Sequence, residues 1–119
     1  MRTRQKRVYD SLIETARGRD LVSYEEIAGM INLDMRYKTD RDEISDILGD
    51  INKEEVSNGQ PMLSAVVVYK ATINSDPRPG PGFYSCALEL GVMQSDDNKR
   101  EFYRDQRNNV YDWWAGVTT

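Results

Sequence analysis

The chain has 119 residues, of which 39% are hydrophobic, and a mean hydropathy of −0.71, which fits one polar domain with a modest core. Its 16 basic and 20 acidic side chains give a net charge of −4, which excludes a uniformly basic protein that coats nucleic acid through charge alone. The sequence has no histidine and a single cysteine, Cys86, which excludes histidine-dependent catalysis, an internal disulfide, and zinc sites made of histidines or clustered cysteines.

The first two predicted helices lie at the start of the chain. Apolar residues at helical spacing predict a helix over residues 4–17, which a short extended piece follows at residues 21–22. Ser23 and Glu26 form a capping-box pattern in which each side chain bonds the other residue's amide, so a second helix is expected from Tyr24 to about residue 31.

A third helix is the clearest element in the sequence. It is expected to be capped by Thr39 or Asp40 and to end at Asn58-Gly59, because apolar residues recur on one face between these signals. Those apolar residues are Ile44, Ile47, Leu48 and Ile51.

A β-hairpin is expected in the second half of the chain. Residues 62–69 are rich in β-branched side chains and predict a strand, whereas residues 74–82 hold three prolines and two glycines and predict a loop. Phe83-Tyr84 is expected to return beside the first strand. Helices are then expected at residues 86–90 and at about 97–114.

The order of these elements predicts an α+β fold, namely a winged helix-turn-helix with a β-hairpin wing and additional C-terminal helices. We expect a single winged-helix-like domain over residues 1–119, with a core at about 4–91 and a C-terminal helix at about 97–114. A small α+β domain without a functional wing is the alternative.

Three segments resemble the DNA-binding domain of O6-alkylguanine DNA alkyltransferases and alkyltransferase-like proteins. VSYEEIA at residues 22–28 is similar to the family's T-x-S-Y-G-E-I-A motif. PMLSAVVV at residues 61–68 lies where the family has its P-C-H-R-V-V strand, and PGPGFY at residues 79–84 lies where it has a glycine-rich wing. The resemblance implies a winged-helix scaffold that binds DNA and turns a damaged base towards a reactive cysteine.

The chain departs from this family at the residues that carry its chemistry. If Pro61 matches the motif proline, Met62 stands at the position of the alkyl-accepting cysteine and Leu63 at that of the activating histidine. Residues 44–52 of the third helix also supply no arginine like the one with which the family fills the space of the flipped base. These departures argue against alkyl transfer.

No enzymatic activity is expected from the remaining residues. Without histidine nothing activates Cys86, whose apolar neighbours predict a buried structural thiol. The carboxylates of the third helix favour its positive end or its solvated face, so we expect neither a metal nor a cofactor.

Charge is distributed unevenly along the chain and decides where a partner would bind. Residues 1–19 carry a net +4, residues 20–60 a net −7, and residues 61–119 a net −1. No stretch approaches the roughly 20 apolar residues needed to cross a bilayer, and no apolar segment follows the charged N-terminus. We therefore expect a cytoplasmic protein with no membrane partner.

The first functional hypothesis is a regulatory protein that binds double-stranded DNA. It would use a basic N-terminal arm together with a cation in the wing. The residues concerned are Arg2, Arg4, Lys6, Arg7 and Arg78. Because the third helix is acidic and would repel phosphates, the arm and the wing are expected to dominate.

The second hypothesis is an acidic protein-interaction module, such as a DNA mimic, that binds a basic protein or a second copy of itself. Its acidic surface on the third helix would consist of Asp42, Glu43, Asp46 and Asp50. An aromatic anchor near the C-terminus would consist of Tyr103, Tyr111, Trp113 and Trp114. The alternative for this last helix is simple packing on the core.

Overall fold

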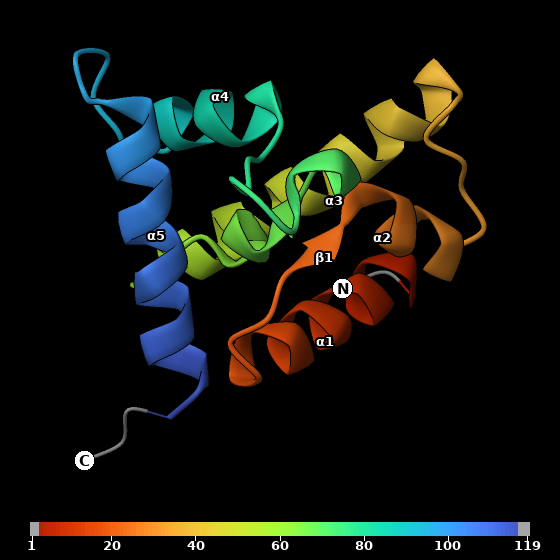
Figure 1. Cartoon of the computed structure of the whole chain (residues 1–119), viewed down its shortest axis with the longest axis horizontal. Helices are drawn as coiled ribbons and strands as arrows, with labels where there is room; N and C mark the ends of the chain where they lie inside the picture. The colour runs from red at the N-terminus through yellow and green to blue at the C-terminus, as the bar shows by residue number, and fades with distance from the viewer. Residues whose placement is uncertain (1–2, 117–119) are drawn as a thin grey trace.

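An apolar segment at residues 62–68 runs through the centre of the fold. The computed structural model describes residues 3–116, and in it Met62, Leu63 and Val67 are 0% exposed. The segment begins as the 3₁₀ helix η1 (Leu63–Val66) and continues as the strand β2 (Val67–Val68). In the described part of the chain, five α-helices are arranged around it (Figure 1): α1 (Thr3–Arg17), α2 (Tyr24–Met30), α3 (Lys38–Ser57), α4 (Pro81–Glu89) and α5 (Lys99–Trp114).

Helices α1 and α2 confirm the predictions for the start of the chain. Val8, Leu12 and Ala16 form the buried face of α1. Ser23 caps α2, because its hydroxyl accepts the Glu26 N–H at 3.1 Å. The reciprocal bond differs from the expected one: the Ser23 hydroxyl donates to the Glu26 carboxylate at 3.3 Å.

Helix α3 has the expected extent and core face, but its predicted cap was wrong. Its N-cap is Tyr37, which makes no side-chain cap, and Thr39 and Asp40 lie within the first turn. The Asp40 carboxylate instead accepts the Asp34 N–H at 2.9 Å and so holds the connection between α2 and α3. An acid in the first turn also suits the positive end of the helix.

The two strands pair in parallel rather than as a hairpin. Strand β1 (Val22–Ser23) lies beside β2, with Val22 opposite Val67 and Ser23 opposite Val68. A parallel pair needs a long crossover between its strands, and α2 and α3 supply it. The predicted strand over residues 62–69 therefore shrinks to two residues, because η1 takes the preceding four.

The predicted return strand at Phe83-Tyr84 was also wrong, because both residues lie in α4. That helix begins at Pro81, with Gly80 as its N-cap. Proline suits this first position because its fixed φ is helical and its missing N–H has no helical partner to lose. Phe83 and Ala87 form the buried side of α4.

Helix α5 is fixed to the central segment by hydrogen bonds as well as by packing. Asn98 caps its start by accepting the Glu101 N–H at 3.0 Å. The Tyr103 hydroxyl donates to the Ala65 carbonyl at 2.9 Å, and the Gln106 side chain accepts the Met62 N–H at 3.2 Å. The α+β class is thus confirmed, as helices around a small parallel sheet.

Candidate functional site

A cleft of about 760 Å³ opens between α3, α4 and the segment that leads from β2 into α4. Tyr24, Tyr69 and Phe83 give it aromatic walls, and hydroxyls, one amide and charged side chains complete the lining. Concave sites that combine apolar walls with a few polar groups are the usual places for a ligand. We therefore take this cleft as the candidate functional site.

Two tyrosines close one end of the cleft around Gly80. The rings of Tyr24 and Tyr69 lie 5.4 Å apart, and the Tyr24 hydroxyl accepts the Gly80 N–H at 2.6 Å. A Cβ at Gly80 would lie 3.1 Å from the Tyr69 hydroxyl oxygen and 3.3 Å from that of Tyr24, so glycine permits this close approach. Burial raises the pKa of Tyr24 to about 12, so its hydroxyl stays protonated at neutral pH.

The Tyr24 hydroxyl is expected to contribute measurably to stability. Tyr24→Phe keeps the ring but leaves the Gly80 N–H without its acceptor, which should lower the free energy of unfolding by about 1 kcal/mol in urea denaturation. Tyr37→Phe is the matched control, because Tyr37 is 58% exposed and should tolerate the change. Equal effects of the two substitutions would contradict this role.

The floor of the cleft is a buried polar pair, Asn52 from α3 and Ser64 from η1. The Asn52 side chain donates to the Ser64 hydroxyl at 2.7 Å and accepts the Ser64 backbone N–H at 3.1 Å. Asn52 is 2% exposed and Ser64 4% exposed. The pair therefore joins α3 to the central segment and places two polar groups at the bottom of the cleft.

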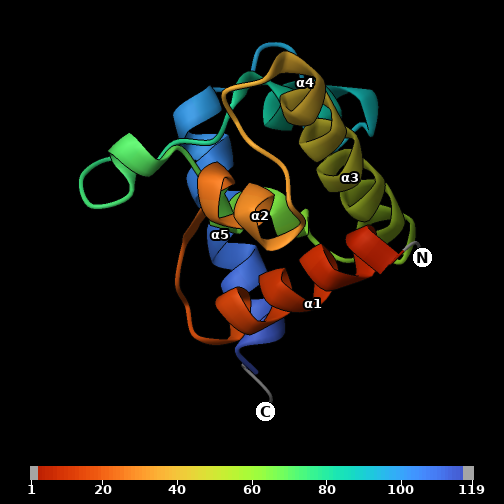
Figure 2. The same cartoon turned by 90° about the vertical axis from the view of Figure 1, so that its right-hand side faces the viewer.

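The loop after β2 projects from the body of the protein (Figure 2, left). It contains the 3₁₀ helix η2 (Lys70–Thr72), and its base is closed by a bond from the Tyr69 N–H to the Arg78 carbonyl at 3.0 Å. Asp76 is paired with Arg100 of α5 at 2.8 Å. Lys70 and Arg78 are exposed and have no ion pair within residues 3–116, so the loop presents two cations.

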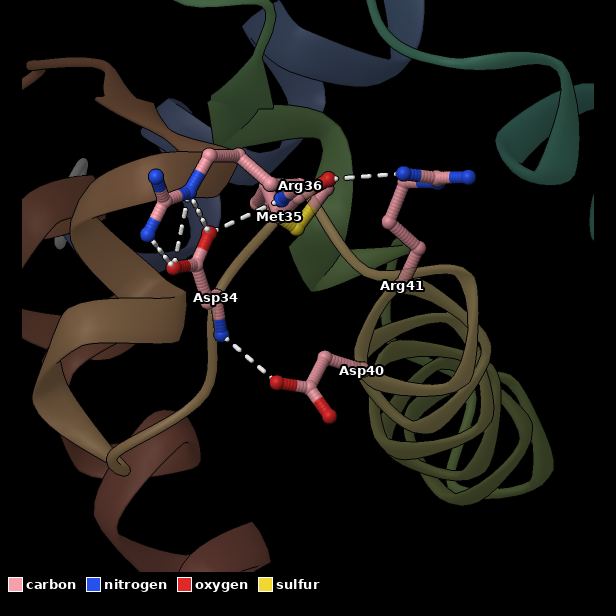
Figure 3. Close-up of polar contacts among 5 residues, drawn as sticks. All are labelled: Asp34, Met35, Arg36, Asp40 and Arg41. Atoms are coloured by element: carbon pink, nitrogen blue, oxygen red, sulfur yellow. Dashed lines mark hydrogen bonds and ion pairs between the residues drawn. The ribbon is translucent and has the colours of Figure 1, made fainter.

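The connection between α2 and α3 orients a further cation (Figure 3). Arg36 binds the Asp34 carboxylate through two nitrogens, and this pair lowers the pKa of Asp34. Arg41 donates to the Met35 carbonyl at 2.9 Å, and both residues line the cleft. Arg41 and Lys53 are thus the cations of the cleft wall.

The cations predicted for the N-terminal arm do not share a surface with the cations of the loop. Arg4 pairs with Glu43, Lys6 with Asp10 at 2.8 Å, and Arg7 donates to the Met30 carbonyl at 3.4 Å. Arg2 lies outside the described residues. Figure 2 shows the start of α1 at the right and the loop that carries Arg78 at the left, so the two predicted halves of a DNA interface lie on opposite sides.

The acidic surface predicted on α3 divides into two pairs. Asp42 binds Lys38 at 2.8 Å and Glu43 binds Arg4, so these two charges are compensated. Asp46 and Asp50 line the cleft and have no ion pair with another described residue.

The predicted aromatic anchor on α5 is mostly part of the core. Tyr103 is buried, and so is Tyr111, whose hydroxyl donates to the Asp20 carbonyl at 2.7 Å. Trp114 is half-buried against Tyr9, with ring centroids 6.5 Å apart. Only Trp113 of the four is exposed, at 52%.

The surroundings of Cys86 do not favour the reactive thiolate form of its side chain. The thiol is half-buried at the edge of the cleft, and this burial raises its pKa. The described residues include no group of three or more side chains placed to hold a metal ion. Across residues 3–116, no helix combines the length and the apolar character that crossing a membrane requires.

Comparison of the chain with models of protein families, with curated proteins and with solved structures found no match. The resemblance to alkyltransferases therefore stays a prediction. The cleft residues Asn52, Ser64 and Tyr69 were not predicted as site residues. Asn52, which follows the apolar residues of the third helix directly, was the one signal in the sequence that pointed to the cleft floor.

Proposed function

We propose that the protein is a non-enzymatic module that binds double-stranded DNA and receives in its cleft a base turned out of the duplex. The proposed scaffold is a variant of the winged helix in which the loop at residues 69–80 takes the place of the hairpin wing. The observation that carries the proposal is the cleft between α3 and α4, which Tyr69 and Gly80 at the base of this loop help to line.

Phosphate binding is assigned to cations of the projecting loop and of the cleft wall. Lys70 and Arg78 lie in the loop, and Arg41 and Lys53 lie in the cleft wall. Such contacts position a protein on the duplex without reading its sequence. Asp46 and Asp50 repel phosphates, so the loop should supply most of the affinity and the interaction should weaken steeply with salt.

The aromatic walls suit a base better than they suit a phosphate. Base-aromatic stacking is favourable for every base, and the exposed Tyr69 and the half-buried Tyr24 offer such surfaces. Proteins that take up a base turn it out of the stack into a pocket of this kind. Burial raises the pKa of the Cys86 thiol, and the chain has no histidine to activate it. The base would therefore be held rather than modified.

Arg78 is expected to dominate the binding of a duplex. Anisotropy of a labelled duplex should give an affinity that falls between about 50 and about 200 mM salt, and Arg78→Ala should weaken binding about threefold to tenfold and flatten this salt dependence.

Lys6→Ala is the matched control for Arg78→Ala, since it removes one exposed cation from the start of α1, and Figure 2 shows this end of the helix on the side away from the loop. It should leave binding nearly unchanged. No duplex binding at low salt would overturn the proposed function, and equal losses in both variants would overturn the interface.

A second candidate is the acidic interaction module, which the uncompensated Asp46 and Asp50 favour. A protein of this kind would bind a basic peptide such as oligolysine at low salt and would not bind a duplex. Asp46→Asn would then weaken the peptide complex, and Asp42→Asn, at a carboxylate that Lys38 already compensates, would change it less.

A further inference from the structure

The polar floor of the cleft has one hydrogen-bond donor to spare. Asn52 gives one amide hydrogen to the Ser64 oxygen at 2.7 Å, and its amide nitrogen lies 4.0 Å from the Cys86 sulfur. The Asn52 carbonyl takes the Ser64 backbone N–H at 3.1 Å. The Ser64 oxygen is therefore fixed as an acceptor, and its own hydrogen must point away from Asn52.

That hydroxyl hydrogen has no acceptor among residues 3–116. Ser64 is 4% exposed, so bulk water satisfies the donor poorly, and the residue lines the cleft. A buried donor without an acceptor is costly, and an acceptor atom that a ligand brings into the cleft removes this cost. The floor is thus complementary to a ligand that ends in a hydrogen-bond acceptor.

The charges of the cleft wall favour an uncharged acceptor. Carboxylates of Asp46, Asp50 and Glu89 line the cleft, against the cations Arg41 and Lys53. A phosphate oxygen at the floor would face this excess of acids, whereas a carbonyl oxygen of a neutral ring would not. Both the walls and the floor therefore suit a flat heteroaromatic carbonyl compound.

We propose that Ser64, oriented by Asn52, selects the occupant of the cleft by donating its hydroxyl hydrogen to a ring carbonyl oxygen. Stacking on tyrosine accepts any base, so it does not discriminate, but a buried donor rejects a ring that lacks the acceptor. This inference rests on the proposed function, in which the ring is a base extruded from DNA.

The test compares three duplexes of otherwise identical sequence. One is fully paired, one carries an unpaired thymine, and one carries in its place difluorotoluene, which has the shape of thymine without its carbonyl acceptors. The protein should bind the thymine duplex about fivefold to tenfold more tightly than the difluorotoluene duplex, as one neutral hydrogen bond predicts. Ser64→Ala should bind these two duplexes equally, and Ser64→Thr, which keeps the hydroxyl, should restore the preference.

Binding of the fully paired duplex distinguishes a failure of the proposed DNA-binding function from a failure of the proposed role of Ser64. If the unaltered protein fails to bind it, the proposed function is wrong. If the paired duplex is bound but thymine and difluorotoluene are bound equally, or the preference survives in Ser64→Ala, the role of Ser64 is wrong. The comparison within the unaltered protein remains decisive even where Ser64→Ala folds poorly.

Discussion

Asn52→Ala is expected to lower the free energy of unfolding by about 3 kcal/mol. The substitution removes both hydrogen bonds to Ser64 and leaves the Ser64 N–H buried without an acceptor, next to a small cavity. Alanine favours the helix interior slightly more than asparagine does, so the loss arises despite a gain in helix propensity.

Urea denaturation of Asn52→Ala beside Asn108→Ala measures this loss. Asn108 lies on the exposed side of α5, so its substitution changes helix propensity without removing a buried contact. We expect Asn108→Ala to unfold at the same urea concentration as the parent or slightly above it. Similar midpoints for the two variants would show that the Asn52–Ser64 pair does not hold α3 to η1.

Glu55→Gln is expected to stabilise the protein at neutral and alkaline pH. Glu55 is 1% exposed, and within the described chain its Oε2 has no hydrogen-bond partner. Burial raises the pKa of its carboxyl above the ordinary 4.5, with a further rise from Glu54 and an opposing effect of the Tyr9 hydroxyl. The Glu55 carboxyl therefore binds its proton more tightly in the folded chain than in the unfolded chain.

The pH dependence follows from that difference in proton affinity. The favourable contribution of Glu55 is complete below the unfolded pKa and is lost as the pH rises through the folded pKa. We expect Glu55→Gln to match the parent near about pH 4 and to exceed it by about 1 kcal/mol near about pH 8. Denaturation across this range checks the result, with the exposed Glu54→Gln as control, and parallel curves for Glu55→Gln and the parent would contradict it.

The helices with one buried face could be predicted from the sequence, and the central segment could not. In α1 and α3 the apolar residues recur at helical spacing because only one side of each helix is buried. The segment at residues 62–68 is buried on every side, so its apolar run carries no period that separates a strand from a 3₁₀ helix. Its β-branched residues favoured a strand throughout, which is right for Val67–Val68 and wrong for Leu63–Val66.

The start of α4 shows a different cause of error. Pro81 follows two prolines and a glycine, and the sequence gives equal local support to a loop and to a helix that begins at a proline. The packing of Phe83 against Phe102 and Tyr103 of α5, with ring centroids 6.0 and 5.7 Å away, stabilises the helix. These contacts join residues distant in sequence, so local patterns do not contain them.

Of the candidate site and its surroundings, only the loop at residues 69–80 could be predicted from the sequence. The cluster of prolines and glycines identified a projecting segment that carries Arg78, whereas the position of the N-terminal cations depends on how α1 packs against α3. The cleft floor joins Asn52 and Ser64 across two elements, and neither residue type predicts the other.

The parallel pairing of β1 with β2 also makes the cleft depend on a contact between distant parts of the chain. The two strands flank α2 and α3 in the chain, so their pairing is a non-local contact. Ser23 and Val68 pair in this sheet, and the residues that follow them are Tyr24 and Tyr69, the two aromatic side chains around Gly80. The sheet thus holds the two tyrosines side by side, so the aromatic end of the cleft forms only when β1 and β2, which lie far apart in the chain, have paired.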